Sequence, residues 1–471
     1  MTATRLKIWD GVGQIGGTKI TVESGGFRLL FDWGLVYEPG GTFWSDAVRP
    51  RAAAAGLRDL LATHDLPHLD GIYPADWAAA AGLAPPDGQT LLWLSHLHKD
   101  HIAALPWLDP AVPTYLHPES LRMLKALVET GAEPVLPAGA CPLPPGEVIE
   151  HGPLRFRALN IDHDIPGACG LLIETPEGVV VYTGDLRYHG LHTDWVEQFI
   201  TEAKALQPKI LLIEGTRFFP PDEREEAPRG RPSSRRATGD PPPRQRGEAD
   251  VPERVAEILH EHRDLAMIAL YPRNTERLAG IVHAVTGMGR LPLLRPATAA
   301  LWAAMGGDLT QVGLYLRPDE EALLDQDGAP PWLVQSAVQA GSLWNTQRVR
   351  ASQREVLLQM ELAMLPDLVD LSPGADSVFI HSNGEPLGPF DPNWAVLQRW
   401  LERFDIPLRW AGCSGHATPE DLVRIVQEIE PKFFMPIHSK HPELFLVPEV
   451  KRILPAQGAS YSVATGRQIG G

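Results

Sequence analysis

The chain is poor in cysteine and has no long apolar run. Its three cysteines, Cys141, Cys169 and Cys413, stand far apart without paired spacing. Such a sparse, odd set argues against a disulfide framework and favours a reducing compartment. The first residues lack the apolar core of a signal peptide, and no segment reaches the length of a membrane span. We therefore expect a cytoplasmic protein with no membrane partner.

Basic side chains are also in deficit. The 42 lysines and arginines are outnumbered by 59 aspartates and glutamates, which gives a formal net charge of −17. Because no global basic field attracts nucleic acid, a polyanion would have to be held by a local patch or by metal ions. With 471 residues, 44% of them hydrophobic, the chain is long enough for two domains, or for one domain interrupted by another.

The stretch from Leu91 to Ile102, LLWLSHLHKDHI, is the most informative part of the sequence. An apolar strand runs directly into His96 and His98, which leave the strand end on the same side because strand side chains alternate. Asp100 and His101 follow in the loop and can face a second point nearby. Imidazole and carboxylate groups are the ligands of zinc and similar ions. The spacing therefore predicts two adjacent metals, a device for hydrolysing phosphate esters and other electrophiles.

A histidine-rich surface loop without metal is the alternative, but four such side chains within six residues argue strongly against it. Two expectations concern the surroundings of this motif. The strand FRLLF ends at Asp32, whose carboxylate either forms a turn or orients a ligand histidine from behind. A helix is expected over residues 103–108, with its N-terminus directed at the metals.

Four later strands are each expected to end at a polar side chain. One strand delivers His163 into a loop, and the strand before TGD delivers Asp185 after a glycine that lets backbone approach closely. ILLIE ends at Glu214, and FFMPI is followed by His438. His163, Asp185 and His438 are candidate ligands, and the strand-end position of Glu214 makes a functional role for it more plausible than a purely structural one.

A separate α/β unit is expected between Glu214 and the strand near Leu408. Its first segment, residues 220–250, is rich in proline, arginine and acidic residues, cannot form a core and should be mobile. A solvated loop is favoured there over an RNA-contacting arm. Helices are then expected over residues 251–262, from Asn274 to about 285, and over 393–404, in alternation with strands.

A small-residue turn follows this unit. Ser414, Gly415 and His416 open a helix that Thr418 can cap. A turn of this kind presents backbone N–H groups to an anion, so we expect these three residues to bind a substrate phosphate.

Taken in order, these motifs resemble the β-CASP branch of the metallo-β-lactamase superfamily and, within it, the ribonuclease J-like nucleases. The resemblance covers nearly the whole chain. It implies an α/β fold, with a metallo-β-lactamase αββα sandwich formed by residues 1–216 and 409–471 and an inserted β-CASP cap domain formed by residues 217–408. It also implies two zinc ions, with Mn²⁺ as the alternative, held on one side by His96, His98 and His163, on the other by Asp100, His101 and His438, and bridged by Asp185.

The implied activity is metal-dependent hydrolysis of phosphodiester bonds in RNA, or in single-stranded DNA, lying in the cleft between the two domains. Asp100, Glu214 and His416 are the implied catalytic residues; Glu214 orients His416, which protonates the departing 3′-oxygen and leaves 5′-phosphate products. Two other functions stay open, a hydrolase of small esters, lactones or thioesters, and a catalytically silent binding subunit. Exonuclease or endonuclease mode is open, as is the oligomeric state, a homodimer included.

Overall fold

The computed structural model describes residues 3–38, 41, 43–45, 47–220 and 247–470. The chain divides into two compact units. The first unit runs to Leu124, resumes at Pro134 and is completed from Gly415 onward, and the second contains Lys125–Glu133 and the chain up to Ser414. Among the helices of the described ranges, none combines the length and the apolarity needed to cross a membrane.

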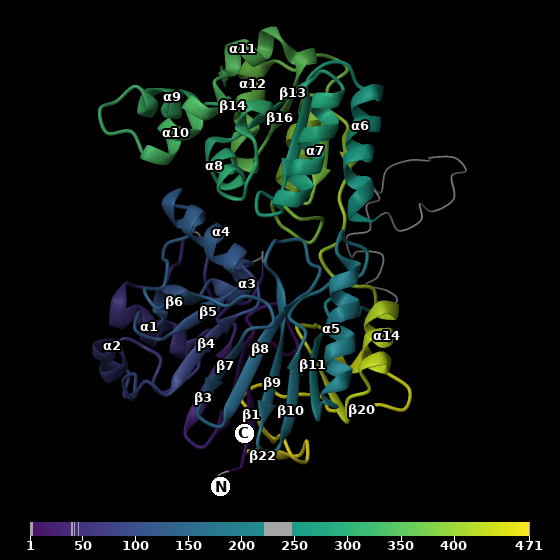
Figure 1. The fold of residues 1–471 in the computed structure, drawn as a ribbon. Helices are drawn as coiled ribbons and strands as arrows, with labels where there is room; N and C mark the ends of the chain where they lie inside the picture. The colour runs from purple at the N-terminus through teal and green to yellow at the C-terminus, as the bar shows by residue number, and fades with distance from the viewer. Residues whose placement is uncertain (1–2, 39–40, 42, 46, 221–246, 471) are drawn as a thin grey trace. The chain divides into compact units, whose positions relative to one another are not determined.

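One sheet of the first unit has the strand order β22-β21-β1-β2-β3-β4-β5-β6 (Figure 1). Both ends of the chain contribute to it, because β1 pairs antiparallel with β21. β2 and β3 form a hairpin at Gly25 and Gly26, whose φ angles of 59° and 90° suit a tight turn. The strands are β1 (Arg5–Asp10), β2 (Lys19–Ser24), β3 (Phe27–Phe31), β4 (Thr90–Leu94), β5 (Thr114–Leu116), β6 (Ala140–Pro142), β21 (Ser460–Ser462) and β22 (Gln468–Gly470).

The second sheet of this unit has the order β20-β19-β11-β10-β9-β8-β7. β10, β11 and β19 run parallel, so their carboxyl ends meet at one edge of the sheet. The strands are β7 (Val148–His151), β8 (Leu154–Asn160), β9 (Cys169–Thr175), β10 (Gly178–Tyr182), β11 (Ile210–Glu214), β19 (Phe433–Ile437) and β20 (Lys451–Arg452).

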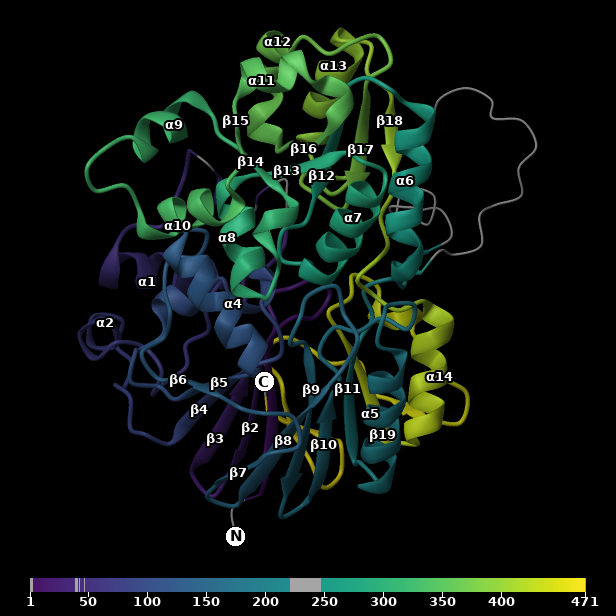
Figure 2. The ribbon, with the colours of Figure 1, turned by 45° about the horizontal axis from the view of Figure 1, so that its top comes forward.

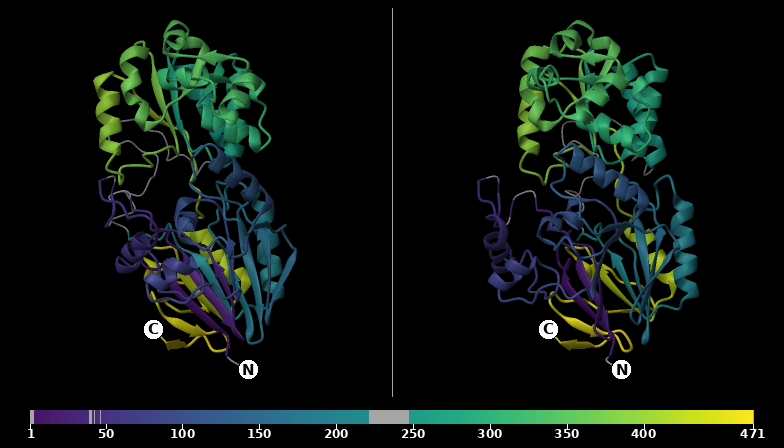
Figure 3. Two further views of the ribbon diagram at one scale, coloured as in Figure 1. Left: turned by 90° about the vertical axis from the view of Figure 1, so that its left-hand side faces the viewer. Right: turned by 60° about the vertical axis from the view of Figure 1, so that its left-hand side comes forward.

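The two sheets face each other across one apolar core, and Figure 3 shows them from the side. Ile8 and Leu29 of one sheet and Phe156, Leu212 and Met435 of the other are buried in that core. Helices α5 and α14 lie side by side (Figure 1, Figure 2). The helices of this part of the chain are α1 (Ala53–Ala62), α2 (Ala75–Ala80), α3 (Lys99–Ile102), α4 (Pro118–Glu129), α5 (Thr193–Ala205) and α14 (Pro419–Ile429).

The helix expected over residues 103–108 is not formed. Helix α3 covers Lys99–Ile102 within the motif itself, and a 3-10 turn follows at Leu105–Trp107. The Ala104 N–H donates to the Trp33 carbonyl instead of to the Asp100 carbonyl, which accepts from Gly17. Pro106 has no N–H to donate. Contacts with distant segments have therefore replaced the helical hydrogen bonds that local pattern predicted.

The second unit is built on a parallel sheet with the order β15-β14-β13-β16-β12-β17-β18. Its strands are β12 (Ala266–Leu270), β13 (Leu291–Leu294), β14 (Gly313–Tyr315), β15 (Leu343–Trp344), β16 (Val356–Gln359), β17 (Val378–Ser382) and β18 (Leu408–Trp410). Its helices are α6 (Val251–Glu261), α7 (Thr275–Gly287), α8 (Pro296–Ala304), α9 (Pro318–Leu324), α10 (Pro331–Ala340), α11 (Thr346–Ala351), α12 (Leu368–Leu371) and α13 (Trp394–Arg403).

Helices cover both faces of this sheet. Residues of α6, α7, α8 and α10 pack against one face, where Ile268 points, and residues of α11, α12 and α13 pack against the other, where Met267 points. The helix expected from Asn274 is α7, and the Asn274 side chain caps it by accepting from the Arg277 N–H at 3.0 Å. The predicted fold class, a two-sheet sandwich with an added α/β unit, is confirmed.

The edges of the second unit differ in detail from the expected limits of 217–408. Strand β18 pairs with β17 of the third sheet, so the chain returns to the first unit at Gly415, later than the return expected at 409. Of the segment expected to be mobile, residues 221–246 lie outside the described residues. Glu248–Asp250 form a 3-10 turn, and the buried Glu248 carboxylate binds the Arg277 guanidinium at 2.5 and 2.6 Å.

Candidate metal centre

The structure brings the seven predicted ligands together as two groups. The first group is His96, His98 and His163, and the second group is Asp100, His101, Asp185 and His438. Within each group the possible ligand atoms all lie within 4.8 Å of one another. Residues far apart in sequence meet because the strands that carry them end at the same edges of the two sheets.

The first group presents three imidazoles to one point. His163 Nε2 lies 3.1 Å from His98 Nδ1, and the His96 ring lies 4.7 and 4.8 Å from the rings of His98 and His163. The buried His96 Nε2 has no hydrogen-bond partner. Burial lowers the pKa of His96 well below its ordinary value and that of His163 to about 3. Both rings are therefore neutral near pH 7, the form that binds a metal.

The second group combines two carboxylates with two imidazoles. His438 Nε2 lies 3.0 Å from Asp100 Oδ2 and 3.4 Å from Asp185 Oδ2, and His101 Nε2 lies 3.2 Å from Asp185 Oδ2. Asp185 Oδ2 also lies 3.8 Å from His96 Nε2 of the first group. Asp185 is therefore placed between the groups, where a bridging carboxylate has to be.

Ionised carboxylates are favoured in this second group. Burial opposes ionisation of Asp185, but the charges of His438 and His101 hold its pKa well below the usual range. The same balance, between burial on one side and His101 and His438 on the other, lowers the pKa of Asp100.

In each ligand histidine, the ring nitrogen that does not face the ligand group contacts an outer partner. Outer partners of this kind fix which nitrogen faces a metal. The contacts are His96 Nδ1 with Ser95 Oγ at 2.9 Å, His101 Nδ1 with Asp32 Oδ2 at 2.8 Å, His163 Nδ1 with the Gly415 carbonyl at 2.6 Å, His438 Nδ1 with Thr216 Oγ1 at 2.8 Å, and His98 Nε2 with Asp164 Oδ1 at 3.2 Å. Each imidazole thus turns its other nitrogen toward the group to which it belongs.

Of the two interpretations of Asp32, the structure supports the orienting partner. Besides the His101 ring, its buried carboxylate accepts from the Ser95 N–H at 2.7 Å, the Ser95 hydroxyl at 2.8 Å and the Tyr182 hydroxyl at 2.6 Å. Hydrogen bonds from Ser95 and Tyr182 thus fix the Asp32 carboxylate, which in turn orients His101.

Glu214 and His416 form a pair beside both groups. Glu214 Oε1 lies 3.2 Å from His416 Nδ1, and its Oε2 accepts from the Thr216 N–H at 3.0 Å. The His416 ring centre lies 5.3 Å from that of His163 and 5.7 Å from that of His438. Burial alone would lower the pKa of His416, but the Glu214 carboxylate raises it to about 9.

Comparison with known proteins agrees with this geometry. Residues 78–227 match the family described as the beta-lactamase superfamily domain. Ribonuclease J of Mycolicibacterium smegmatis is 22% identical over 483 residues, which cover 98% of this chain and 75% of that protein. Residues 78–227 therefore belong to the metallo-β-lactamase superfamily. Ribonuclease J of Pyrococcus abyssi is 24% identical over 74% of this chain and 73% of its own length.

A solved structure extends this superfamily relationship to the whole fold. A protein of unknown function from Enterococcus faecalis is 27% identical, with a TM-score of 0.75 over 98% of this chain and 99% of its own. The likeness therefore covers both units, and the chain is a distant, nearly full-length relative of the ribonucleases J.

The residues present fit the dinuclear centre typical of this superfamily. His96 Nε2 and Asp185 Oδ1 are buried polar atoms without a hydrogen-bond partner, which would cost free energy if nothing bound there. The donors are imidazole nitrogens and carboxylate oxygens, a set suited to zinc and related divalent ions. The centre is that of a metal-binding hydrolase.

Two backbone groups of the turn expected to bind phosphate already have hydrogen-bond partners within the protein. The Gly415 carbonyl accepts from His163, and the Ala417 N–H donates to the Leu186 carbonyl at 2.7 Å. Thr418 caps α14 as predicted, accepting from the Asp421 N–H at 3.1 Å. Phosphate binding by Ser414, Gly415 and His416 stays a prediction.

Sequence reasoning missed the residues that support the ligands. Ser95, Thr216 and Tyr182 each stand within two residues of a motif, which is the signal that could have identified them. Gly34 carries no local signal. A Cβ on Gly34 would lie 1.5 Å from the Asp100 carbonyl oxygen, so this position has to be glycine for the motif loop to pack.

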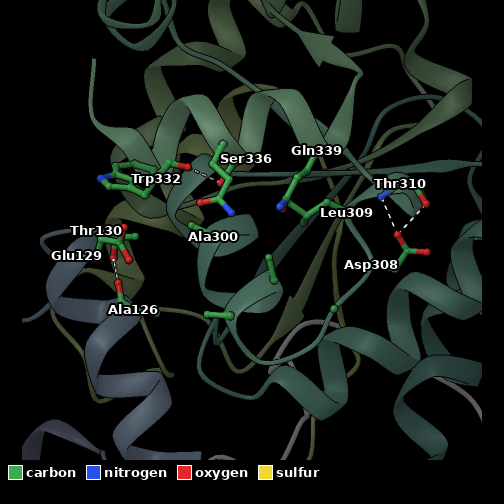
Figure 4. Close-up of a pocket in the computed structure, with 14 residues that line it drawn as sticks. Ala126, Glu129, Thr130, Ala300, Asp308, Leu309, Thr310, Trp332, Ser336 and Gln339 are labelled. Atoms are coloured by element: carbon green, nitrogen blue, oxygen red, sulfur yellow. Dashed lines mark hydrogen bonds between the residues drawn. The ribbon is translucent and has the colours of Figure 1, made fainter. Parts of the chain in front are cut away.

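A separate hollow of about 470 Å³ lies within the second unit (Figure 4). Its walls include Trp332 and Ser336 of α10, and its Asp308 carboxylate is already used to accept from the Thr310 N–H at 3.0 Å. None of the described residues that line it belongs to either group of ligands. This hollow is not the metal centre.

Proposed function

We propose that the protein is a metal-dependent ribonuclease of the β-CASP type that hydrolyses phosphodiester bonds, with single-stranded DNA as a second substrate. The observation that carries the proposal is the Glu214–His416 pair beside two groups of metal ligands. A metal centre alone would serve equally for esters, lactones or thioesters, but a buried acid that holds a histidine provides a proton for a poor leaving group. The nearly full-length similarity to ribonuclease J supports the same activity.

Each group of side chains has its own part in this mechanism. Two bound ions, zinc or manganese, would activate a water for in-line attack and neutralise the charge that develops on the phosphate. Asp185 would hold both ions, and Asp100 would hold the second. Glu214 fixes the orientation of His416, which donates a proton to the departing 3′-oxygen. The products carry a 5′-phosphate and a 3′-hydroxyl.

The experiment compares substrates directly. Metal-loaded protein is incubated with end-labelled RNA, with end-labelled single-stranded DNA and with a panel of chromogenic esters across a range of pH. We expect RNA cleavage to 5′-phosphate products, abolished by a chelator and restored by zinc or manganese. Brisk ester hydrolysis without phosphodiester cleavage at any pH would establish the alternative, a small-ester hydrolase.

Two variants separate metal binding from proton transfer. His98→Ala should abolish turnover by disrupting the first group, whereas His416→Ala should reduce turnover and keep both ions, as counted by elemental analysis of the dialysed protein. His283→Ala, at an exposed position of α7, is the matched control and should retain both turnover and ions. Full metal loss in the His416 variant would contradict this division of labour.

A further inference from the structure

The loop between β1 and β2, GVGQIGG (residues 11–17, the glycine loop), is bonded to the second group of ligands. The Gly17 N–H donates to the Asp100 carbonyl at 3.0 Å, and the Gly11 carbonyl accepts from the His438 N–H at 2.8 Å. His438 has a left-handed backbone with φ of 51°, a conformation that non-glycine residues keep only when their surroundings enforce it. Two of the four ligands in this group therefore depend on the position of this loop.

The glycine loop packs tightly against the segment that carries Asp100. A Cβ on Gly16 would lie 2.4 Å from the Asp100 Cβ. Gly11, Gly16 and Gly17 have φ angles of 92°, 77° and 70°, a region in which glycine has no steric penalty. A shift of the loop would consequently move Asp100 as well.

One buried ion pair holds the loop from beneath. Lys19 Nζ donates to Asp10 Oδ2 and to the Gly17 carbonyl, both at 3.1 Å, and the Lys19 side chain is fully buried. Asp10 Oδ1 accepts from the Gly11 N–H at 3.0 Å and from Gln14 Nε2 at 2.6 Å. The pair thus fixes the first, middle and last residues of the loop.

A contribution to the stability of the fold does not by itself explain why this ion pair is buried. Desolvation of the two charges offsets much of their attraction, and apolar residues of similar size commonly serve the fold as well. The hydrogen bonds of this pair are instead directional, and they end on a loop that touches two metal ligands. Positioning is the function that this geometry provides.

We propose that Asp10 and Lys19 are positioning residues for the second group of ligands. They hold the glycine loop in the conformation that places Asp100 and His438 around their ion. The inference rests on the proposed metal centre, but not on the identity of the substrate.

The test is the affinity of each ion in Lys19→Met. Competition with a chromogenic chelator measures both affinities, and elemental analysis after dialysis counts the ions. We expect one of the two zinc ions to bind at least tenfold more weakly and the other to bind as in the parent. Combining Lys19→Met with His98→Ala identifies the ion, because that protein should retain none after dialysis.

The matched control is Arg28→Met at the far end of the β2–β3 hairpin. Arg28 Nε lies 2.9 Å from Glu23 Oε1, in a partly exposed pair remote from the strand end that leads to Asp32. We expect this variant to bind both ions with parental affinity. Parental affinity for both ions in a folded Lys19→Met protein, or an equal loss of both, would overturn the proposal.

A milder variant decides the matter if Lys19→Met does not fold. Gln14→Ala removes one contact of Asp10 and leaves the ion pair intact, and we expect a several-fold loss of affinity for the same ion. Unchanged affinities in Gln14→Ala would then overturn the proposal. A parent protein that binds two ions but cleaves no RNA would refute the proposed ribonuclease and leave this inference standing.

Discussion

Asp32→Asn keeps the size of a buried side chain and removes its charge. In the native protein the carboxylate accepts from the His101 ring at 2.8 Å, from the N–H and hydroxyl of Ser95 at 2.7 and 2.8 Å, and from the Tyr182 hydroxyl at 2.6 Å. An amide offers one acceptor oxygen and brings two N–H donors of its own. The amide cannot accept from all of these donors, so the donors that face its NH₂ group lose their buried hydrogen bonds.

The magnitude follows from the number of bonds. A hydrogen bond to a charged group contributes roughly 1.5–3 kcal/mol net, so losing two lowers the free energy of unfolding by about 3–6 kcal/mol. Loss of an outer partner of a ligand histidine typically weakens metal binding by about 10- to 100-fold, which is about 1.4–2.7 kcal/mol. Since Asp32 holds His101, we expect this loss for the ion of the second group.

Urea unfolding of the metal-free protein measures the first quantity, and chelator competition measures the second. Asp59→Asn is the matched control, because Asp59 pairs with the largely exposed Arg51 on the surface. We expect that control to unfold at nearly the same urea concentration as the parent, because solvent screens an exposed pair, and to bind both ions as the parent does. Parental affinity for both ions in a folded Asp32→Asn protein would refute the orienting role and leave Asp32 as a turn residue with φ of 58°.

Three further outcomes follow from the structure. Gly34→Ala should lower the free energy of unfolding by more than about 3 kcal/mol, because its Cβ would lie 1.5 Å from the Asp100 carbonyl oxygen. Gly13→Ala, which meets no atom within 4 Å, should cost only about 1 kcal/mol for its positive φ in the same urea assay; equal losses would contradict the packing argument. Burial lowers the pKa of His381 to about 4, so below about pH 6.5 the unfolded chain takes up a proton that the native protein does not. The free energy of unfolding should therefore fall by up to about 3 kcal/mol from pH 6.5 to 4, and by less in His381→Gln; an unchanged pH dependence in that variant would assign the effect to other groups. Removing the ions with a chelator should lower the melting temperature, because ions bind the native state alone, and calorimetry with and without added zinc measures the difference.

Local chemistry accounts for what could be predicted from the sequence. The hairpin at Gly25 and Gly26 and the caps at Asn274 and Thr418 depend on residues within four positions of one another. The ligand candidates were identifiable for a related reason, since each follows an apolar strand and a strand end is where a sheet exposes polar side chains to a site. That the ends of β10, β11 and β19 meet follows from their parallel pairing, which the structure shows.

The contacts that support the ligands could not be predicted from the local sequence pattern. The choice between a turn and an orienting role for Asp32 depended on Ser95 and Tyr182, which reach it from two different sheets. The helix expected over residues 103–108 failed because Gly17 and Trp33 took part in its hydrogen bonding.

The sequence by itself determined which side chains stand at strand ends and which local turns and caps form, because those depend on neighbours along the chain. Tertiary structure alone decided which nitrogen of each histidine faces a metal, that Asp185 lies between the two groups, and that Lys19 and Asp10 hold the glycine loop. The Lys19–Asp10 contact is short-range in sequence, but the contacts that orient His101, His163 and His438 join residues that are tens to hundreds of positions apart. Only the packing of the two sheets around one core brings such atoms together.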